Sequence, residues 1–188
     1  MEDHLQNFHH HRLIPAAYKP HFRMYEKEDS FMDATLEEKM DAAEQRGRDY
    51  FRQGLNCTEC VLRTFMDLHQ TELPDSVLKL ASGFGLGMGN TRNTCGAVVG
   101  AVMALGAARG TDPLQIEAPA DRIAQVREQV YPPVAALIQE IQQEYGTLIC
   151  RELSAPHGDF DGRTRKKSCQ QFIGYCCRLA EKYAAENL

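Results

Sequence analysis

The stretch Thr94–Ala104, TCGAVVGAVMA, decides the fold because it predicts a helix with almost no side chains along one face. Gly96, Gly100 and Ala104 recur every four residues, and residues at this spacing lie on the same face of a helix. A second backbone can approach such a face closely. Thr94 is a typical N-cap residue and precedes the apolar run. We therefore expect a central, buried helix that begins after Thr94.

Upstream of this segment the sequence also predicts helices. Thr35 with Glu38 forms a capping box before one helix, and Asn56 is a cap for a second helix with an apolar side. A short helix is expected after Pro74. The stretch Gly83–Gly89 has a glycine at every second position, so we expect an irregular, glycine-rich loop before the central helix.

Downstream, a long helical pattern covers Asp121–Tyr145, and the pair Pro132–Pro133 must break or kink it. Thr147 is the candidate cap of a short turn of helix. Ser168 with Gln171 has the pattern of a capping box, so we expect the last helix to begin there and to run to about residue 185. No alternating pattern of useful length predicts a strand.

Length and composition fit one domain. The chain has 188 residues, of which 43% are hydrophobic, which allows a fair-sized core. We predict an all-α fold, a single compact domain of about six helices over residues 32–188. Residues 1–31 mix His, Pro, aromatic and charged residues without a period, and we expect a mobile N-terminal leader there.

Charge and hydropathy exclude several functions. Lys and Arg total 21 against 26 Asp and Glu, a formal charge of −5, so nucleic acid is not an expected partner. No apolar run approaches the roughly 20 residues of a membrane-spanning helix. The start of the chain lacks a secretory pattern, so we expect a reducing, cytoplasmic location in which the cysteines are thiols, metal ligands or redox groups.

Four cysteines lie at predicted helix starts. Three directly follow a predicted cap, and the fourth lies in the first turn after Thr147: they are Cys57, Cys95, Cys169 and Cys150, respectively. Free N–H groups and the helix dipole favour a thiolate there, so we expect lowered thiol pKa values and convergence into one site. A single cysteine is more often core filler, but core packing gives no preference for first turns.

The other three cysteines fit simpler roles. Cys57 and Cys60 form a Cys-x-x-Cys motif, in which Cys60 is either a resolving thiol or a core residue. Val61 follows Cys60, so the Cys-x-x-Cys-His motif for covalent haem is absent. Cys176 and Cys177 lie on the apolar side of the last helix and are expected to pack in the core.

The four cysteines and their neighbours resemble a known family, the redox-active proteins named for the pattern C_GCAxxG_C_C. The segment Cys95–Gly100, CGAVVG, is similar to the family's CGAxxG motif, and Cys57 in Asn-Cys-Thr-Glu is similar to its first cysteine. Cys150 and Cys169 resemble the third and fourth. The resemblance covers roughly residue 36 onward. It implies a redox role and assigns no role to the remaining cysteines.

Three hypotheses follow for Cys57, Cys95, Cys150 and Cys169 as catalytic, cofactor-binding or metal-ligating residues. Four thiolates suit an iron–sulfur cluster used in electron transfer. Without a cofactor, they suit dithiol exchange with a redox partner protein or a small thiol. As an alternative, they suit a non-catalytic zinc- or metal-binding protein. The small-residue face of the central helix is also compatible with a homodimer.

Other candidate motifs have simpler interpretations. The glycines before Arg92 match neither a dinucleotide-binding nor a Walker motif. We expect His69 and His157 to be ordinary surface residues. A basic run before Cys169 comprises Arg163, Arg165, Lys166 and Lys167. Such a run could lower the Cys169 pKa or dock an acidic partner, but charge runs are usually solvated, and we expect solvated surface here.

Overall fold

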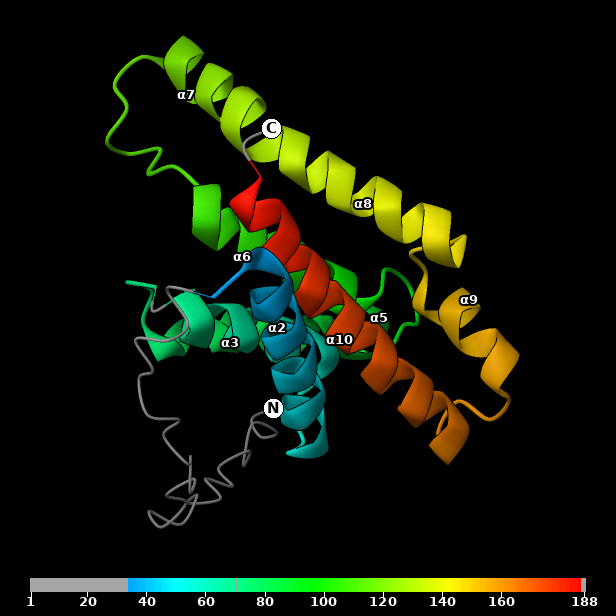
Figure 1. Ribbon diagram of the computed structural model, residues 1–188. Helices are drawn as coiled ribbons and strands as arrows, with labels where there is room; N and C mark the ends of the chain where they lie inside the picture. Colours follow the sequence, from blue (N-terminus) through cyan, green and yellow to red (C-terminus); the bar gives the residue numbers. More distant parts are fainter. Residues whose placement is uncertain (1–33, 70, 187–188) are drawn as a thin grey trace, which may run out of the picture.

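Helices make up the regular structure of residues 34–69 and 71–186, the part of the chain that the computed structural model describes (Figure 1). Within this part there is no β-strand, and the all-α prediction is confirmed. The predicted leader, residues 1–31, lies outside the described residues. The longer helices are α2 (Leu36–Arg52), α3 (Cys57–His69), α6 (Gly96–Arg109), α8 (Tyr131–Tyr145) and α10 (Arg163–Ala185).

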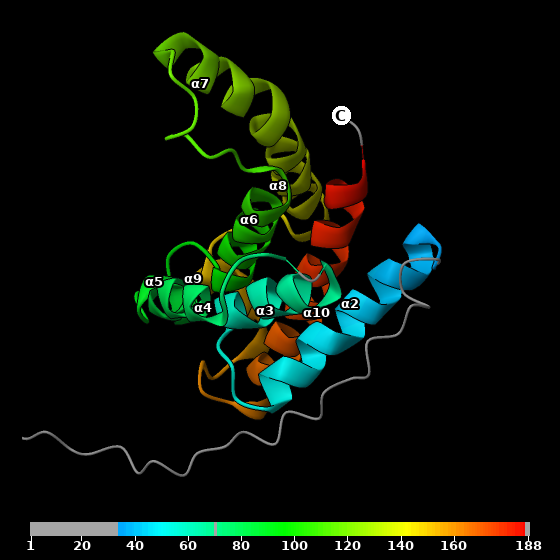
Figure 2. The same cartoon turned by 90° about the vertical axis from the view of Figure 1, so that its left-hand side faces the viewer.

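Short helical segments connect the longer helices. They are η1 (Asp75–Val77), α4 (Leu78–Ala81), η2 (Ser82–Phe84), α5 (Gly85–Met88), α7 (Pro119–Gln125), η3 (Val126–Val130), α9 (Cys150–Ser154) and η4 (Ala155–His157). The predicted break near Pro132–Pro133 corresponds to η3, a π-helical turn just before α8. Figures 1 and 2 show α7, η3 and α8 as one long, bent rod.

The two predicted upstream caps are confirmed. Thr35 accepts a hydrogen bond from the Glu38 N–H, and the Glu38 carboxylate accepts one from the Thr35 N–H at 2.8 Å. At the start of α3, Asn56 Oδ1 accepts from the N–H groups of Thr58 and Glu59 at 2.9 and 3.1 Å. These bonds satisfy N–H groups that the helix itself leaves without partners. They fix where α3 begins, and therefore where Cys57 lies.

The predicted small-residue face of α6 packs against α3. A Cβ atom added at Gly100 would lie 2.8 Å from the Thr58 carbonyl oxygen and 2.9 Å from Val61 Cβ. Gly96 is similarly enclosed by the side chains of Cys57 and Thr58. The face that suggested a homodimer is therefore covered from within the chain, and α6 is the buried helix that its sequence predicts.

Helix α10 completes the core by packing against α2, α3, α6 and α8. Figures 1 and 2 show it crossing the middle of the fold beside α2. Its inward side chains join a core whose fully buried members include Phe65, Leu105, Leu137, Ile173 and Leu179. No described helix is both long enough and apolar enough to cross a membrane.

The glycine-rich stretch is not confirmed as the irregular loop that we expected. Its residues form η2 and α5, and the five consecutive residues 86–90 have positive φ angles. Leu86 and Met88 adopt this left-handed conformation at an energetic cost, because their Cβ atoms crowd the backbone. Gly87 adopts the same conformation without this cost because it has no Cβ atom. There is also no space for one, since an added Cβ would lie 2.7 Å from Cys150 Cβ. The stretch thus forms a compact wall beside Cys150.

Candidate functional site

Cys57 occupies the first position of α3 and lies against the backbone of α6. A Cβ atom on Gly96 would come within 2.5 Å of Cys57 Sγ, so only glycine leaves room for this thiol. Gly96 directly follows Cys95, which is the N-cap residue of α6. The close contact between α3 and α6 therefore brings the first two cysteines of the pattern together.

Cys95 and Cys150 are held together by backbone hydrogen bonds. Their preceding residues, Thr94 and Ile149, form an isolated antiparallel bridge. The Cys95 N–H donates to the Leu148 carbonyl at 2.9 Å, and the Cys150 N–H donates to the carbonyl of residue 93 at 2.7 Å. Cys150 begins α9, with Ile149 rather than the predicted Thr147 as its cap. Backbone hydrogen bonds thus connect the start of α6 to the start of α9.

The prediction that Cys169 lies at the start of the last helix is wrong. Helix α10 begins at Arg163 after Gly162, so Cys169 lies almost two turns inside the helix and not in its first turn. Ser168 does not cap the helix; its hydroxyl is hydrogen-bonded to His157 Nε2 at 2.7 Å. The helix starts earlier because four of the five residues 163–167 are Arg or Lys, which favour a helix.

All four cysteines nevertheless line one cavity of about 80 Å³. Three of the cysteines come from the starts of α3, α6 and α9, and Cys169 comes from within α10. Cys95 and Cys150 are buried, whereas Cys57 and Cys169 are partly exposed. The remaining walls are mainly apolar and include Phe51, Leu86, Phe172 and Ile173. The structure brings the four predicted residues together, and their chemical role stays a prediction.

The expectation of lowered thiol pKa values is wrong for three of these cysteines. Burial raises the pKa of Cys95, Cys150 and Cys169, because a thiolate loses more hydration than a thiol when it is enclosed. The guanidinium of Arg165 opposes this rise at Cys150 and Cys169. Desolvation therefore outweighs the helix-start effect at Cys95 and Cys150, and burial favours the thiol form of all three groups.

Arg165 is part of the site, although the sequence placed it on the surface. Its side chain is 3% exposed and lines the cysteine cavity, one helical turn before Cys169. Its guanidinium carbon lies 3.8 Å from the centre of the Phe160 ring, and that of Arg92 lies 4.0 Å from the same centre. The neighbours Arg163, Lys166 and Lys167 are exposed, as predicted.

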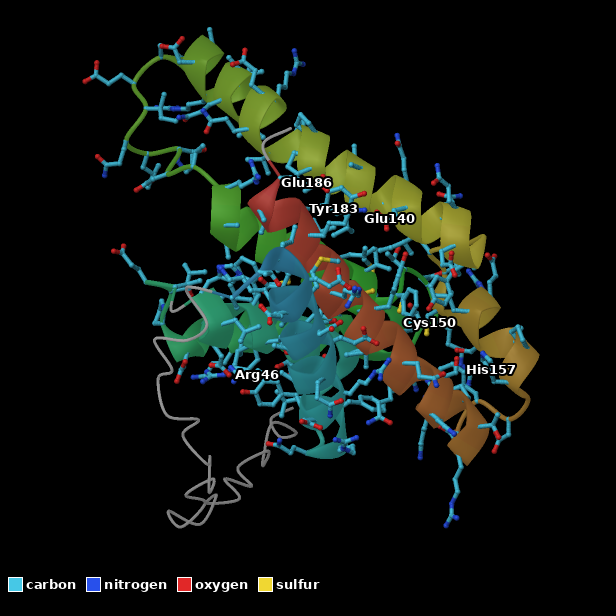
Figure 3. All side chains as sticks on the ribbon, in the orientation of Figure 1. Arg46, Glu140, Cys150, His157, Tyr183 and Glu186 are labelled. Carbon is cyan, nitrogen blue, oxygen red and sulfur yellow. The ribbon has the colours of Figure 1, made fainter. Side chains whose placement is uncertain are left out.

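His157 also lies closer to the site than the sequence suggested. With Ser168 it lines a second cavity of about 60 Å³, whose walls include Cys95, Cys150 and Cys169. Figure 3 shows Cys150 and His157 at the two ends of the α9–η4 segment, beside the first half of α10. The hydrogen bond to Ser168 holds the His157 ring at this position. Only the tertiary packing of η4 on α10 reveals the contact.

The other three cysteines are core residues. Cys176 and Cys177 are buried, and Cys177 Sγ fills the space that a side chain at Gly47 would need, which confirms the packing prediction. Cys60 is fully buried, donates to the Leu55 carbonyl at 3.4 Å and does not line the cysteine cavity. Burial raises the pKa of all three thiols. The resolving role considered for Cys60 therefore finds no support.

A wider depression is separate from the cysteine cavity. The depression, about 1000 Å³, lies near His69 and Met103 and is lined by no cysteine. His69 does not simply face solvent there, because it pairs with the buried carboxylate of Glu181 at 2.8 Å. Within residues 34–69 and 71–186, no group of three or more His, Cys, Asp or Glu side chains is placed to hold a metal ion.

Fold and site together define an all-α protein in which four cysteines line a small, mainly apolar cavity. Comparison with known families then gives a direct assignment. Residues 55–183 match the family described as "Putative redox-active protein (C_GCAxxG_C_C)". The match covers more than half of the chain, so the protein belongs to this family. No curated protein and no solved structure gives a match to the chain.

Proposed function

We propose that the protein carries out two-electron thiol–disulfide chemistry with the four cysteines of the cavity. The observation that supports this proposal is the convergence of Cys57, Cys95, Cys150 and Cys169 on one 80 Å³ cavity. Disulfide exchange requires an accessible attacking thiol and a second thiol nearby. Cys57 and Cys169 are partly exposed, and the buried Cys95 and Cys150 line the same cavity.

The proposed reaction proceeds through a mixed disulfide. The thiolate of Cys57 or Cys169 attacks the disulfide of an oxidised partner, a small disulfide or a protein, and releases one partner thiol. A neighbouring cysteine of the cavity then attacks the mixed disulfide and releases the second partner thiol. In total, two cysteine thiols lose two electrons and two protons, and the partner disulfide gains them. Arg165 favours the thiolate at Cys169 and Cys150.

The iron–sulfur and zinc hypotheses have support from donor chemistry alone. Four thiolates are suitable ligands for either group. The side chains as placed do not form a ligand set within the described part of the chain, so the proposed reaction involves neither group.

The first experiment is metal, acid-labile sulfide and visible absorption analysis of protein purified anaerobically. We expect reduced, metal-free protein that loses two hydrogen atoms per disulfide when it is treated with oxidised glutathione, with the disulfides mapped by mass spectrometry to the cavity cysteines. Cys57→Ser should abolish or reroute this disulfide, whereas Cys176→Ser, outside the cavity, should not. Iron with matching sulfide, or zinc in a redox-silent protein, would overturn the proposal.

A further inference from the structure

Cys169, the partly exposed thiol on α10, needs a base in order to react quickly near neutral pH. Only the thiolate attacks a disulfide, and burial raises the pKa of this thiol above its ordinary value. The guanidinium of Arg165 opposes that rise, but it is always protonated and accepts no proton. A neighbouring base that takes the thiol proton would therefore speed the reaction.

A second cavity at Cys169 contains a suitable base. Cys169 lines the four-cysteine cavity, which is almost wholly apolar, and also the cavity of about 60 Å³ in which polar atoms form part of the lining. The titratable groups of this second cavity are three of the cysteines, Tyr145 and His157. Burial raises the pKa of Tyr145, so its phenol keeps its proton. Histidine is the side chain that ordinarily changes charge near neutral pH, so His157 is the group suited to accept a thiol proton.

Two features hold the His157 ring at this cavity. The η4 segment packs on both α9 and α10, the helices that carry Cys150 and Cys169. The Ser168 hydroxyl is hydrogen-bonded to His157 Nε2 at 2.7 Å. In the tautomer that donates the Nε2 proton to Ser168, Nδ1 keeps a free lone pair. A cavity of about 60 Å³ has room for only a few waters, so a proton can cross it directly or through a short water bridge.

The charges around His157 are compatible with this role. No Asp or Glu lines the second cavity among the described residues, so no carboxylate there competes for the proton. The charged side chain enclosed nearby is Arg165, which favours the thiolate of Cys169. The remaining charges at this end of α9 and α10 and in the loop between them are exposed: Arg151, Glu152, Asp159, Asp161, Arg163, Lys166 and Lys167.

We propose that the imidazole of His157 accepts the proton of the Cys169 thiol, which makes Cys169 the attacking cysteine. The S–H bond of Cys169 breaks, an N–H bond forms on the ring, and no electrons are exchanged in this step. When the thiolate attacks a partner disulfide, the imidazolium returns the proton to the partner thiolate that leaves. The inference rests on the proposed function and selects Cys169 over Cys57, which does not line the second cavity.

The pH profile of alkylation tests the proposal. Iodoacetamide is uncharged and reacts by attack of the thiolate on its CH₂ carbon with loss of iodide. Rates at Cys169 and Cys57 are measured by mass spectrometry in the native protein and in His157→Gln, whose amide can still bond to Ser168 but cannot take up a proton. We expect the rate at Cys169 near pH 7 to fall about a hundredfold in the variant, and the difference to vanish at high pH, where the thiol ionises without a base.

Cys57 is the control within the same molecule, because it lines the first cavity but not the second. Its profile should be the same in both proteins; an equal fall at both cysteines would indicate a general change of structure and overturn the proposal. Ser168→Ala removes the hydrogen bond and keeps the imidazole. A large loss at Cys169 in Ser168→Ala with none in His157→Gln would show that the contact matters and the proton does not, and would also overturn it.

The native profile decides the matter if His157→Gln does not fold, as judged by circular dichroism. A plateau of the Cys169 rate near neutral pH would support the proposal. A rate that rises about tenfold per pH unit through this range, as for a thiol without a base, would overturn it.

The outcomes for the proton transfer and for the proposed function are separate. A His157-dependent profile in a protein that forms no disulfide with oxidised glutathione would support the proton transfer and refute thiol–disulfide chemistry. Disulfide formation with the same Cys169 profile in the native protein and in His157→Gln would support thiol–disulfide chemistry and refute the proton transfer.

Discussion

Replacing Gly100 with alanine tests whether α3 and α6 depend on backbone contact. The added Cβ would lie 2.8 Å from the Thr58 carbonyl oxygen and 2.9 Å from Val61 Cβ, inside the roughly 3.5 Å of ordinary contact. The two helices must separate, and such overpacking costs about 1–3 kcal/mol. Alanine also favours a helix over glycine by about 1 kcal/mol, which offsets part of the cost.

Gly106→Ala is the matched control because this position lies on the same helix and nothing lies within 4 Å of an added Cβ. The helix-propensity gain is common to both variants, so their difference isolates the clash. We expect urea unfolding to give Gly106→Ala a free energy of unfolding about 1–3 kcal/mol above that of Gly100→Ala, or several degrees in Tm. Equal stabilisation by both substitutions would refute the close contact.

Three further predictions concern the helix start, the thiol contact and the effect of pH. Asn56→Ala should lower the free energy of unfolding by about 1 kcal/mol in urea because α3 loses its cap, whereas Asn56→Asp should not. Gly96→Ala should displace the Cys57 thiol and slow its alkylation or disulfide formation, measured by mass spectrometry against Gly106→Ala. Burial and a hydrogen bond to Asp67 raise the pKa of Tyr50 to about 12, above its unfolded value near 10. The stability from its neutral phenol is therefore complete below pH 10 and is lost between about pH 10 and 12, so Tyr50→Phe should flatten the stability curve there.

The sequence predicts those parts of the fold in which the local signal and the tertiary packing agree. The cap at Asn56 predicts where α3 begins, and the spacing of Gly96 and Gly100 predicts a helix face that another backbone can approach. In the structure α3 packs on that face. Ser168 shows the limit of such signals. Its capping-box pattern is genuine, but helix-forming residues continue upstream as far as Arg163, so the helix extends through it.

The site residues that the sequence missed are those whose burial depends on distant elements. Arg165 lies in a basic run that would ordinarily be solvated, and only the ring of Phe160 and the packing of α10 enclose it. His157 reaches the site through the fold of η4 onto α10. The pKa prediction failed for a related reason: a helix start favours a thiolate, but the burial that accompanies it at Cys95 favours the thiol more.

Cys95 is the residue around which the site is built, because two independent contacts fix its position. On one side, the glycine at position 96 admits the sulfur of Cys57, so the packing of α3 on α6 sets their separation. On the other side, the backbone bridge between residues 94 and 149 sets the position of Cys150. The contact between α3 and α6 requires a residue without a side chain at position 96. The bridge between residues 94 and 149 is made by backbone atoms alone. The CGAxxG motif thus joins the packing of the core to the placement of the thiols, so that loosening α6 from α3 must also disturb the cavity.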